Sequence, residues 1–476
     1  MSIQFSGIPS SIRKPGKYFE FNTALAVRTL PANKQKLLIV GQKTSSGTVA
    51  QKVPTKVFSD KTAETYFGAG SLCHLMARAA IKSNPYLDLT VIGLDDAGAG
   101  VAATGTVTFT GPATSAGVLT LYIGNQKVEI AIAKDDTATV IGAALVAQIA
   151  KQPDLPVTSA AALGVVTLTA KNKGICGNQI GLGYDLTNAA GVTVAIVAMA
   201  SGATNPTLQD ALTVVFAGDY NIVVTPFNNQ TDLGTLKTHL DSVSGPMEQR
   251  PGIGVYGMNG ALADATTLAG QVNSGRMLGA YVRCTSATKR RSMPYEIASA
   301  KAALLAYEED PARPLNGLEL SSIAVPDISD RLSRTEQETC LSNGVAPLEV
   351  GPGEKVQVVR AISTYLKDAQ GVDDISLFDI TTIRTLDYLR KACRERVALR
   401  FPREKLSSKT PPKVRAELLD VLMKLEELEI VEEVAANKAG LIVERSVQDP
   451  NRLDAQIPSD IVNGLHVLAA RIELYL

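Results

Sequence analysis

Tryptophan is absent from this 476-residue chain, and only three histidines occur in it. Neither sign of charge is in excess, since 47 lysines and arginines balance 47 aspartates and glutamates. The composition therefore gives no global argument for a nucleic acid or a membrane surface as partner. Long hydrophobic runs are missing as well, because stretches such as residues 192–200 are too short to span a bilayer. The N-terminus lacks a basic segment followed by an apolar one, so we expect no signal peptide and a soluble cytosolic product.

Cysteine is scarce, and its spacing excludes two common roles. The five cysteines are Cys73, Cys176, Cys284, Cys340 and Cys393. An odd number of widely spaced cysteines without a Cys-x-x-Cys pair does not build a disulfide framework, so we expect buried thiols in a reducing compartment. The histidines, at positions 74, 239 and 466, have no histidine or cysteine at metal-ligand spacing. We therefore predict structural or surface histidines, and neither a metal nor a cofactor.

Motifs for catalysis are also missing. No glycine-rich run ends in Gly-Lys-Ser or Gly-Lys-Thr, and no Gly-x-Ser-x-Gly elbow occurs. The run Gly252-Ile-Gly254-Val-Tyr-Gly257 matches Gly-x-Gly-x-x-Gly, but a nucleotide fingerprint needs a strand before the glycines and a helix straight after them. Here the run itself is typical of a strand. We predict no enzyme and no catalytic residues; the alternative, a nucleotide-dependent α/β enzyme, requires these glycines to lie between strand and helix.

Residues 1–35 have few periodic apolar positions and several breakers, which predicts an N-terminal arm that becomes ordered on a partner. Its apolar anchors are Ile3, Phe5, Tyr18, Phe19 and Phe21. Such a segment suits strand addition at the edge of a neighbour's sheet.

From residue 36 the pattern alternates between buried strands and helices up to residue 94, and it resumes from 206 to 325. Alternation of this kind predicts an α/β domain with a parallel sheet covered by helices. Residues 95–205 interrupt it with short strands rich in Gly, Thr and Val and one helix, residues 137–151. We interpret them as a small β-sandwich or barrel inserted at an exposed loop. The alternative is a monomeric adhesion or binding module built on this β-domain.

Residues 326–440 are predicted to form an α+β C-terminal domain, with a strand from Val356 and a long helix after Asp379. Basic residues gather on this helix, namely Arg384, Arg390, Lys391, Arg394 and Arg396. They are consistent with a solvated face that complements the helix C-terminus, or with a helix that docks on an acidic surface. The residue pattern leaves both interpretations open.

Residues 441–476 are predicted to form a C-terminal arm with two strand patterns. Their apolar residues are Leu441, Ile442, Val443, Val467, Ile472, Leu474 and Leu476. The second pattern runs to the last residue, and a strand without a partner in its own chain is open to pairing with another chain.

Several of these stretches also form a recognisable set. They are KPGKYFEF at residues 14–21, the run from Gly344 to Val397 that contains GVAP, VQVVRAISTY and DITTIRTLDYLRKACRERV, and the closing residues 443–476, which begin VERSVQDPNRLDAQIPSDI. In this combination and order they resemble the contractile phage tail sheath proteins of the Mu-like type. The resemblance covers both ends and the α/β regions, and little of it is found in residues 95–205.

The resemblance implies a parallel-sheet sheath domain with an inserted all-β domain, an α+β C-terminal domain and extended terminal arms. It implies a structural subunit that polymerises as stacked hexameric rings around a tail tube and contracts to drive the tube through the host envelope during genome ejection. The implied partners are copies of this chain, the tube protein, and baseplate and tail terminator proteins, without direct nucleic-acid binding or membrane insertion. The implied place is the virion tail, after assembly in the bacterial host cytoplasm. The basic helix would face the tube, and the arms would join neighbouring subunits.

Overall fold

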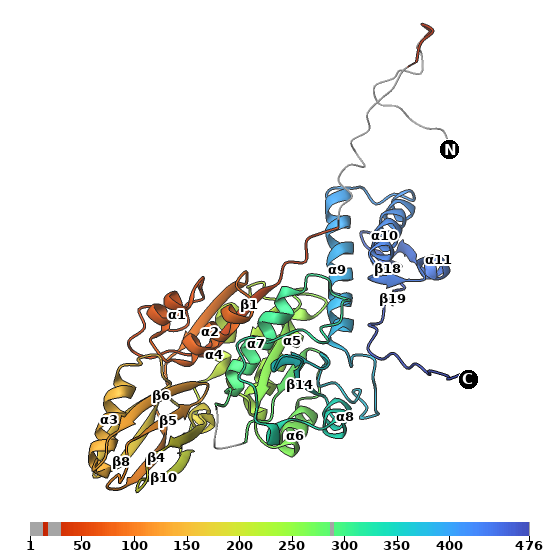
Figure 1. Cartoon of the computed structure of the whole chain (residues 1–476). Helices are drawn as coiled ribbons and strands as arrows, with labels where there is room; N and C mark the ends of the chain where they lie inside the picture. The colour runs from red at the N-terminus through yellow and green to blue at the C-terminus, as the bar shows by residue number, and fades with distance from the viewer. Residues whose placement is uncertain (1–12, 18–29, 286–289, 476) are drawn as a thin grey trace. The chain divides into compact units, whose positions relative to one another are not determined.

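The computed structural model describes residues 13–17, 30–285 and 290–475 (Figure 1). The chain divides into two units: a larger one with residues 33–388 and 461–476, and a smaller one with residues 1–32 and 389–460. The predicted N-terminal anchors and the last residue of the C-terminal arm lie outside the described residues; they are Ile3, Phe5, Tyr18, Phe19, Phe21 and Leu476.

An eight-stranded sheet forms the centre of the larger unit, in the order β15-β14-β13-β12-β11-β1-β3-β2. Its strands are β1 (Lys36–Gln42), β2 (Thr55–Lys56), β3 (Asp88–Leu94), β11 (Ile222–Val224), β12 (Ile253–Met258), β13 (Met277–Tyr281), β14 (Val345–Gly351) and β15 (Lys355–Val358). The six strands from β3 to β14 pair in parallel, and β2 and β15 pair antiparallel at the two edges. The predicted parallel sheet is therefore present. It also extends further than predicted, because residues 345–358 belong to it and not to a separate C-terminal domain.

Helices cover this sheet, as its fully buried strands require. They are α1 (Asp60–Phe67), α2 (Leu72–Ser83), α4 (Leu208–Val215), α5 (Gln230–Ser244), α6 (Leu262–Val272), α7 (Pro294–Tyr307) and α8 (Arg334–Ser342), with the short 3-10 helix η3 (Ile328–Asp330). Several begin at capping side chains; Ser71, for example, accepts a hydrogen bond from the backbone N–H of His74. Helix α7 is buried along nearly its whole length, so it is the central helix of the unit.

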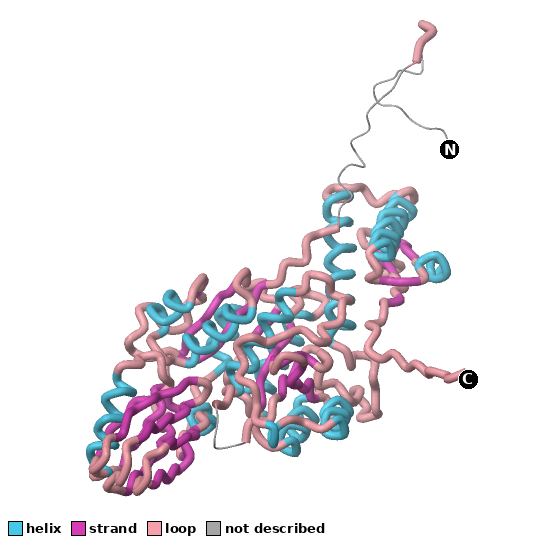
Figure 2. The backbone as a smooth tube through the Cα atoms, in the orientation of Figure 1, coloured by secondary structure: helices cyan, strands magenta, loops and turns pink. Residues whose placement is uncertain are grey.

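Residues 95–205 fold into two antiparallel sheets and one helix (Figures 1 and 2). The elements are β4 (Ala102–Thr110), β5 (Gly117–Ile123), β6 (Gln126–Ile132), α3 (Ala138–Ala150), β7 (Val157–Ala162), β8 (Val165–Lys173), the 3-10 helix η2 (Ile175–Gln179), β9 (Leu182–Thr187) and β10 (Thr193–Ala200). The sheet orders are β10-β4-β8-β7 and β6-β5-β9. Buried and more exposed residues alternate along β4 and β8, which is typical of strands with one face in a core. The parallel sheet resumes with β11, which pairs with β1.

The smaller unit contains two long helices and a β-hairpin. Its elements are α9 (Ile380–Arg400), α10 (Thr410–Glu427), β16 (Val431–Glu432), α11 (Val434–Asn437), the 3-10 helix η4 (Lys438–Gly440), β17 (Ile442–Arg445), β18 (Leu453–Gln456) and β19 (Asp460–Ile461). Two boundaries fall inside elements, because residues 380–388 of α9 and residue 461 of β19 are assigned to the larger unit. Strands β17 and β18 form a two-stranded antiparallel sheet.

Candidate functional site

The glycine motif of residues 252–257 has a packing role. Gly254 and Gly257 lie within strand β12, and not in a turn between a strand and a helix. A Cβ at Gly257 would lie 1.9 Å from the carbonyl oxygen of Pro294, so only glycine lets α7 approach the strand this closely. The nucleotide fingerprint needs the glycines to open a helix, and here they do not.

His74, His239 and the five cysteines are buried side chains. His74 accepts a hydrogen bond through Nδ1 from the N–H of Gly70 at 3.0 Å, and its Nε2 lies 3.0 Å from Asp60 Oδ1. His239 packs edge-on against Phe216, with ring centroids 5.9 Å apart. All five cysteines are buried and free, and burial raises the pKa of the Cys176 thiol to about 12. Among the described residues, no group of three or more side chains could hold a metal ion, and no helix is long and apolar enough to cross a membrane.

Two of the five residues predicted to face a tube are buried within their own units. Arg384 is 5% exposed and donates a hydrogen bond to the carbonyl oxygen of Glu308, and burial lowers its pKa to about 10. Arg396 is 4% exposed and contacts two carboxylates of α10, Glu417 Oε2 at 3.2 Å and Asp420 Oδ2 at 2.5 Å. The prediction was wrong for these two side chains, because both bind groups of this chain that lie far from them in the sequence.

The other three basic residues lie closer to solvent. Arg394 is exposed, and Arg390 and Lys391 are half-buried. Lys391 Nζ donates to the carbonyl oxygen of Ala32 at 2.9 Å, so it also holds the described end of the N-terminal segment. The basic face predicted for this helix is thus reduced to Arg390, Lys391 and Arg394, and its role stays a prediction.

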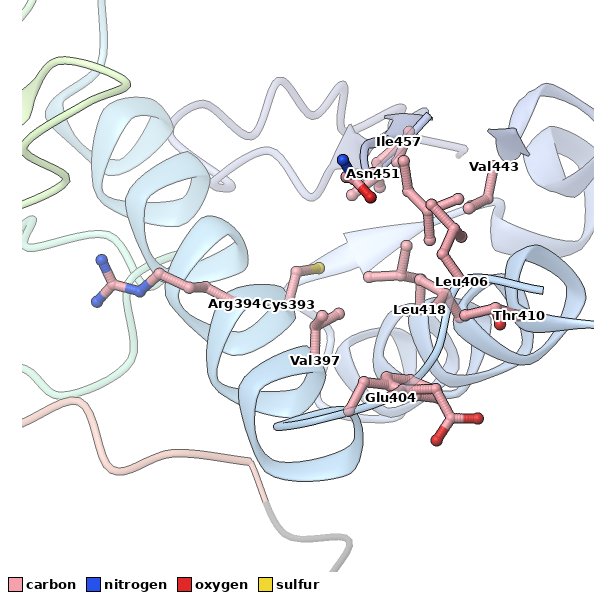
Figure 3. A pocket seen from close by; sticks show the side chains of 14 residues that line it. Cys393, Arg394, Val397, Glu404, Leu406, Thr410, Leu418, Val443, Asn451 and Ile457 are labelled. Carbon is pink, nitrogen blue, oxygen red and sulfur yellow. The ribbon is translucent and has the colours of Figure 1, made fainter. Parts of the chain in front are cut away.

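An apolar cavity of about 470 Å³ lies in the smaller unit, between helices α9 and α10 and the β17–β18 hairpin (Figure 3). Its apolar lining includes Val397, Leu406, Leu418, Val443, Leu453 and Ile457. In Figure 3 the side chain of Arg394 points away from the other labelled side chains, whereas Cys393 points toward them. Both residues line the cavity, and their side chains extend in different directions from adjacent positions of α9. The sequence contains a signal for part of this lining, because Cys393 and Val397 are four residues apart and so share one face of the helix.

The hairpin over this cavity has open edges. Among the described residues no other strand pairs with β17 or β18, so each leaves one row of backbone N–H and C=O groups without a strand partner. Leu441 and Val443, predicted as arm residues, belong instead to this folded unit. Leu441 is 1% exposed and its carbonyl oxygen accepts from Arg415 Nε at 2.7 Å, while Ile442 remains 45% exposed. The first part of the predicted arm is therefore a folded hairpin strand.

The described part of the C-terminal tail, residues 462–475, contains no helix or strand. Its apolar side chains are exposed, and they are Leu465, Val467, Leu468, Ile472, Leu474 and Tyr475. The strand predicted here does not form within the chain, because the described tail finds no strand partner. Leu468, Ile472 and Leu474 stand at even positions, so an extended backbone would place them on one face.

Near its start the tail is held to the larger unit by His466. Its Nδ1 lies 2.9 Å from Nδ2 of Asn316, which donates, and its Nε2 lies 3.7 Å from Asp379 Oδ1. Asp379 in turn accepts two hydrogen bonds from Arg360, at 2.8 and 2.7 Å. Burial and the Arg360 guanidinium lower the pKa of His466, against the opposing effect of Asp379. No local sequence signal identified this contact, since Asn316 is 150 residues away.

The comparisons with known proteins agree on one family. The phage tail sheath protein central domain matches residues 201–364, and the phage tail sheath C-terminal domain matches residues 372–475. The Mu-like prophage FluMu tail sheath protein of Haemophilus influenzae is 35% identical over 494 aligned positions, which cover all of both chains.

Solved structures share the fold at low sequence identity. The sheath tail protein of Desulfitobacterium hafniense aligns with a TM-score of 0.52 at 13% identity, over 94% of this chain and 97% of that one. A chain of the anti-feeding prophage baseplate aligns with a TM-score of 0.51 at 11% identity, over 98% and 100%. The fold, both domain matches and the full-length relative point to one family. This chain therefore belongs to the phage tail sheath protein family and is a structural subunit of a Mu-like contractile sheath.

Proposed function

We propose that copies of this chain join through strand addition, in which the C-terminal tail of one copy pairs with the open β17–β18 hairpin of the next. The proposal rests on one observation. The same chain contains a hairpin with unpaired edges beside an apolar cavity and a tail with exposed apolar side chains. The hairpin offers open backbone edges over an apolar cavity of about 470 Å³. The tail exposes Leu468, Ile472 and Leu474 at alternate positions.

Strand addition suits this pair of surfaces physically. Backbone hydrogen bonds along the hairpin edge supply affinity, and side chains at alternate positions of the added strand enter pockets beside it. With a rise of about 3.3 Å per residue, residues 467–475 span roughly 30 Å, longer than the four-residue strand β17 or β18. The occupant is a second copy, because such links repeat from subunit to subunit and generate a polymer. Residues 1–35 are the second arm of this proposal.

In this proposal the polymer consists of stacked hexameric rings around a tail tube, capped by baseplate and tail terminator proteins. It assembles in the bacterial cytoplasm, and its contraction drives the tube through the host envelope during genome ejection. Residues 95–205 are an inserted domain of the α/β sheath domain. The protein acts mechanically and carries no enzymatic activity. Arm links remain closed while the bodies turn, since backbone hydrogen bonds do not depend on body orientation.

The arm proposal is tested by changing one face of the tail in the full-length chain. Leu468→Asp, Ile472→Asp and Leu474→Asp together place carboxylates where the apolar face would enter the neighbour's cavity. We expect folded protomers that no longer form tubes in negative-stain electron microscopy, with tube protein present. The matched control, Arg471→Gln with Glu473→Gln, changes the opposite face and should still form tubes. Regular tubes from the triple aspartate variant would overturn the proposal, as would a wild-type chain that never polymerises with tube protein.

Electron microscopy of a second set of variants tests the surface of α9 that we propose contacts the tube. The three outer basic residues of α9, Arg390, Lys391 and Arg394, would form salt-screened contacts to an acidic tube, which suit an interface that must release. Reversing all three to Glu should abolish assembly on tubes, while tail-linked polymers still form without tubes. Arg403→Glu, Lys405→Glu and Lys409→Glu reverse three exposed charges of the same unit and serve as the control. Normal sheaths on tubes from the first variant would contradict this assignment.

A further inference from the structure

The order of the parallel strands marks one place in the larger unit as special. The order β3-β1-β11-β12-β13-β14 means that the chain continues to one side of β1 with β3 and to the other side with β11. In open α/β sheets, ligands bind at such a switch point, in the crevice outside the carboxyl ends of the strands. Here the switch point lies between β1 and β11, at Gln42 and Val224.

Side chains and backbone of residues 95–205 fill this place at the end of β1. Gln42 is fully buried, and its Nε2 donates to Asp96 Oδ1 and to the carbonyl oxygen of Lys173, both at 2.7 Å. The second carboxylate oxygen of Asp96 accepts from the N–H of Lys173 at 3.0 Å. Hydrogen bonds therefore join the last residue of β1 to two parts of the segment, its first residues and the end of its strand β8.

The next contact is at the start of helix α2. Asn172 is buried, and its Oδ1 accepts from the backbone N–H of Leu72 at 3.0 Å. Its Nδ2 donates to the carbonyl oxygen of Lys43 at 3.0 Å and to Asp96 Oδ1 at 3.1 Å. Helix N-termini beside such crevices commonly bind anionic ligands through their N–H groups. In this chain the amide oxygen of Asn172 accepts the hydrogen bond from one of those N–H groups, so that group is not available to a ligand.

Two further contacts lie at the ends of β11 and β12. The thiol of Cys176 is 3.4 Å from the carbonyl oxygen of Pro226, which follows β11. Gln179 Nε2 donates to Asn228 Oδ1 at 2.6 Å, and Asn228 Nδ2 donates to the carbonyl oxygen of Gly257 in β12 at 2.9 Å. The segment thus contacts the carboxyl end of β1 and the residues that follow β11 with directional polar groups, and it is linked to β12 through Asn228. A loosely attached surface domain would not need such a buried set.

We propose that residues 95–205 are a built-in plug of the ligand crevice of the α/β sheet. Polar groups of the segment, with Asp96, Asn172 and Lys173 at their centre, take the hydrogen bonds that a bound ligand takes in other sheets of this kind. The plug makes the segment and the sheet one cooperative folding unit, and it closes the crevice to nucleotides and other small molecules. The insertion adds no strand to the eight-stranded sheet; in this proposal it fills the crevice at the carboxyl ends of the strands, where we had expected attachment through an exposed loop.

The test is hydrogen exchange of the full-length protein followed by mass spectrometry. Asn172→Leu keeps the side-chain volume and removes its three hydrogen bonds. We expect amide exchange to rise roughly tenfold both in β8 and, across the interface, in residues 40–43 and the first turn of α2. Thr167→Val, a half-buried position on the same strand, is the control and should leave exchange in β1 and α2 unchanged.

The reciprocal variant keeps the proposal falsifiable if Asn172→Leu does not fold. Gln42→Met changes the sheet side of the interface and should raise exchange in residues 95–97 and 171–173. Faster exchange confined to the mutated side, in either variant, would overturn the proposal. So would a wild-type protein whose β-segment exchanges through a separate opening, well before the end of β1 and the start of α2.

Discussion

The larger and the smaller unit end their sheets in different ways. In the larger unit the eight-stranded sheet has short edge strands, β2 with two residues and β15 with four, and helices cover its fully buried strands. In the smaller unit the described sheet of β17 and β18 has two strands, and an apolar cavity lies beside it. A sheet of eight strands covered by helices is stable without added strands, whereas a two-stranded sheet is marginal alone. The comparison teaches that the larger unit pairs its strands within the chain, while the smaller one has the unpaired strand edges on which the proposed arm exchange rests.

The largest effect is expected at the buried charge of the smaller unit. Arg396→Ala would leave Glu417 and Asp420 without the guanidinium that lies against both. Removing one partner of a buried ion pair costs about 3–5 kcal/mol when the other charge is left uncompensated. Because Arg400 and Lys424 stay beside these carboxylates, we expect the lower end of this range, a loss of about 3 kcal/mol in the free energy of unfolding. Urea unfolding followed by circular dichroism measures it. Glu395→Ala, at an exposed position of the same helix, should change the value by less than about 0.5 kcal/mol. Equal losses would show that α9 is not held by this cluster.

The second prediction concerns the free-energy cost of burying a lysine in the larger unit. Lys301 on α7 is fully buried, its Nζ has no hydrogen-bond partner among the described residues, and burial lowers its pKa to about 7. Between pH 7 and roughly 10 the unfolded chain holds a proton that the folded one lacks, so stability rises with pH across that window. Below pH 7 both states are protonated and the cost is constant.

Replacing Lys301 removes the free-energy cost of burying its ammonium group. It also removes the rise of the free energy of unfolding with pH that this group causes. We expect Lys301→Met to raise the free energy of unfolding at pH 7 by about 2 kcal/mol or more, and to flatten its change between pH 7 and 10. Denaturant unfolding at several pH values is the measurement. Lys134→Met, at an exposed position, is the control and should leave the slope in place. A destabilised Lys301→Met would show that the ammonium is satisfied, and the larger unit would then carry no such cost.

The smallest effect is expected where the tail leaves the larger unit. The folded pKa of His466 is lowered, so the fold binds fewer protons there than the unfolded chain does. The stability from this contact is therefore present above pH 6.5 and is lost as pH falls through the folded pKa. Protonated Nδ1 can no longer accept from Asn316. We expect exchange of residues 461–466, corrected for its intrinsic pH dependence, to be faster at pH 5 than at pH 7. In His466→Gln this difference should disappear; its persistence would assign it to another group.

Much of the fold follows from local patterns in the sequence. Buried runs such as residues 36–41 and alternating helices predicted the parallel sheet, and the strand at residues 252–257 was recognised despite its glycine motif. The four-residue spacing of Cys393 and Val397 likewise places both on one face of α9, and both line the cavity. These features are local, because a residue's neighbours at steps of two, three or four decide which face it shares.

The partners of those faces were decided by the tertiary structure. A count of arginines on α9 could not show that Arg384 meets Glu308, 76 residues away, or that Arg396 meets two carboxylates of another helix. The pattern of β8 likewise did not show that Asn172 reaches the start of α2, 100 residues away. By itself the sequence determined the alternating strands and helices of the parallel sheet and that α9 is basic, but not that residues 462–475 form no strand within the chain. Only the folded chain decided which charges are buried, because burial depends on distant segments that no local period records.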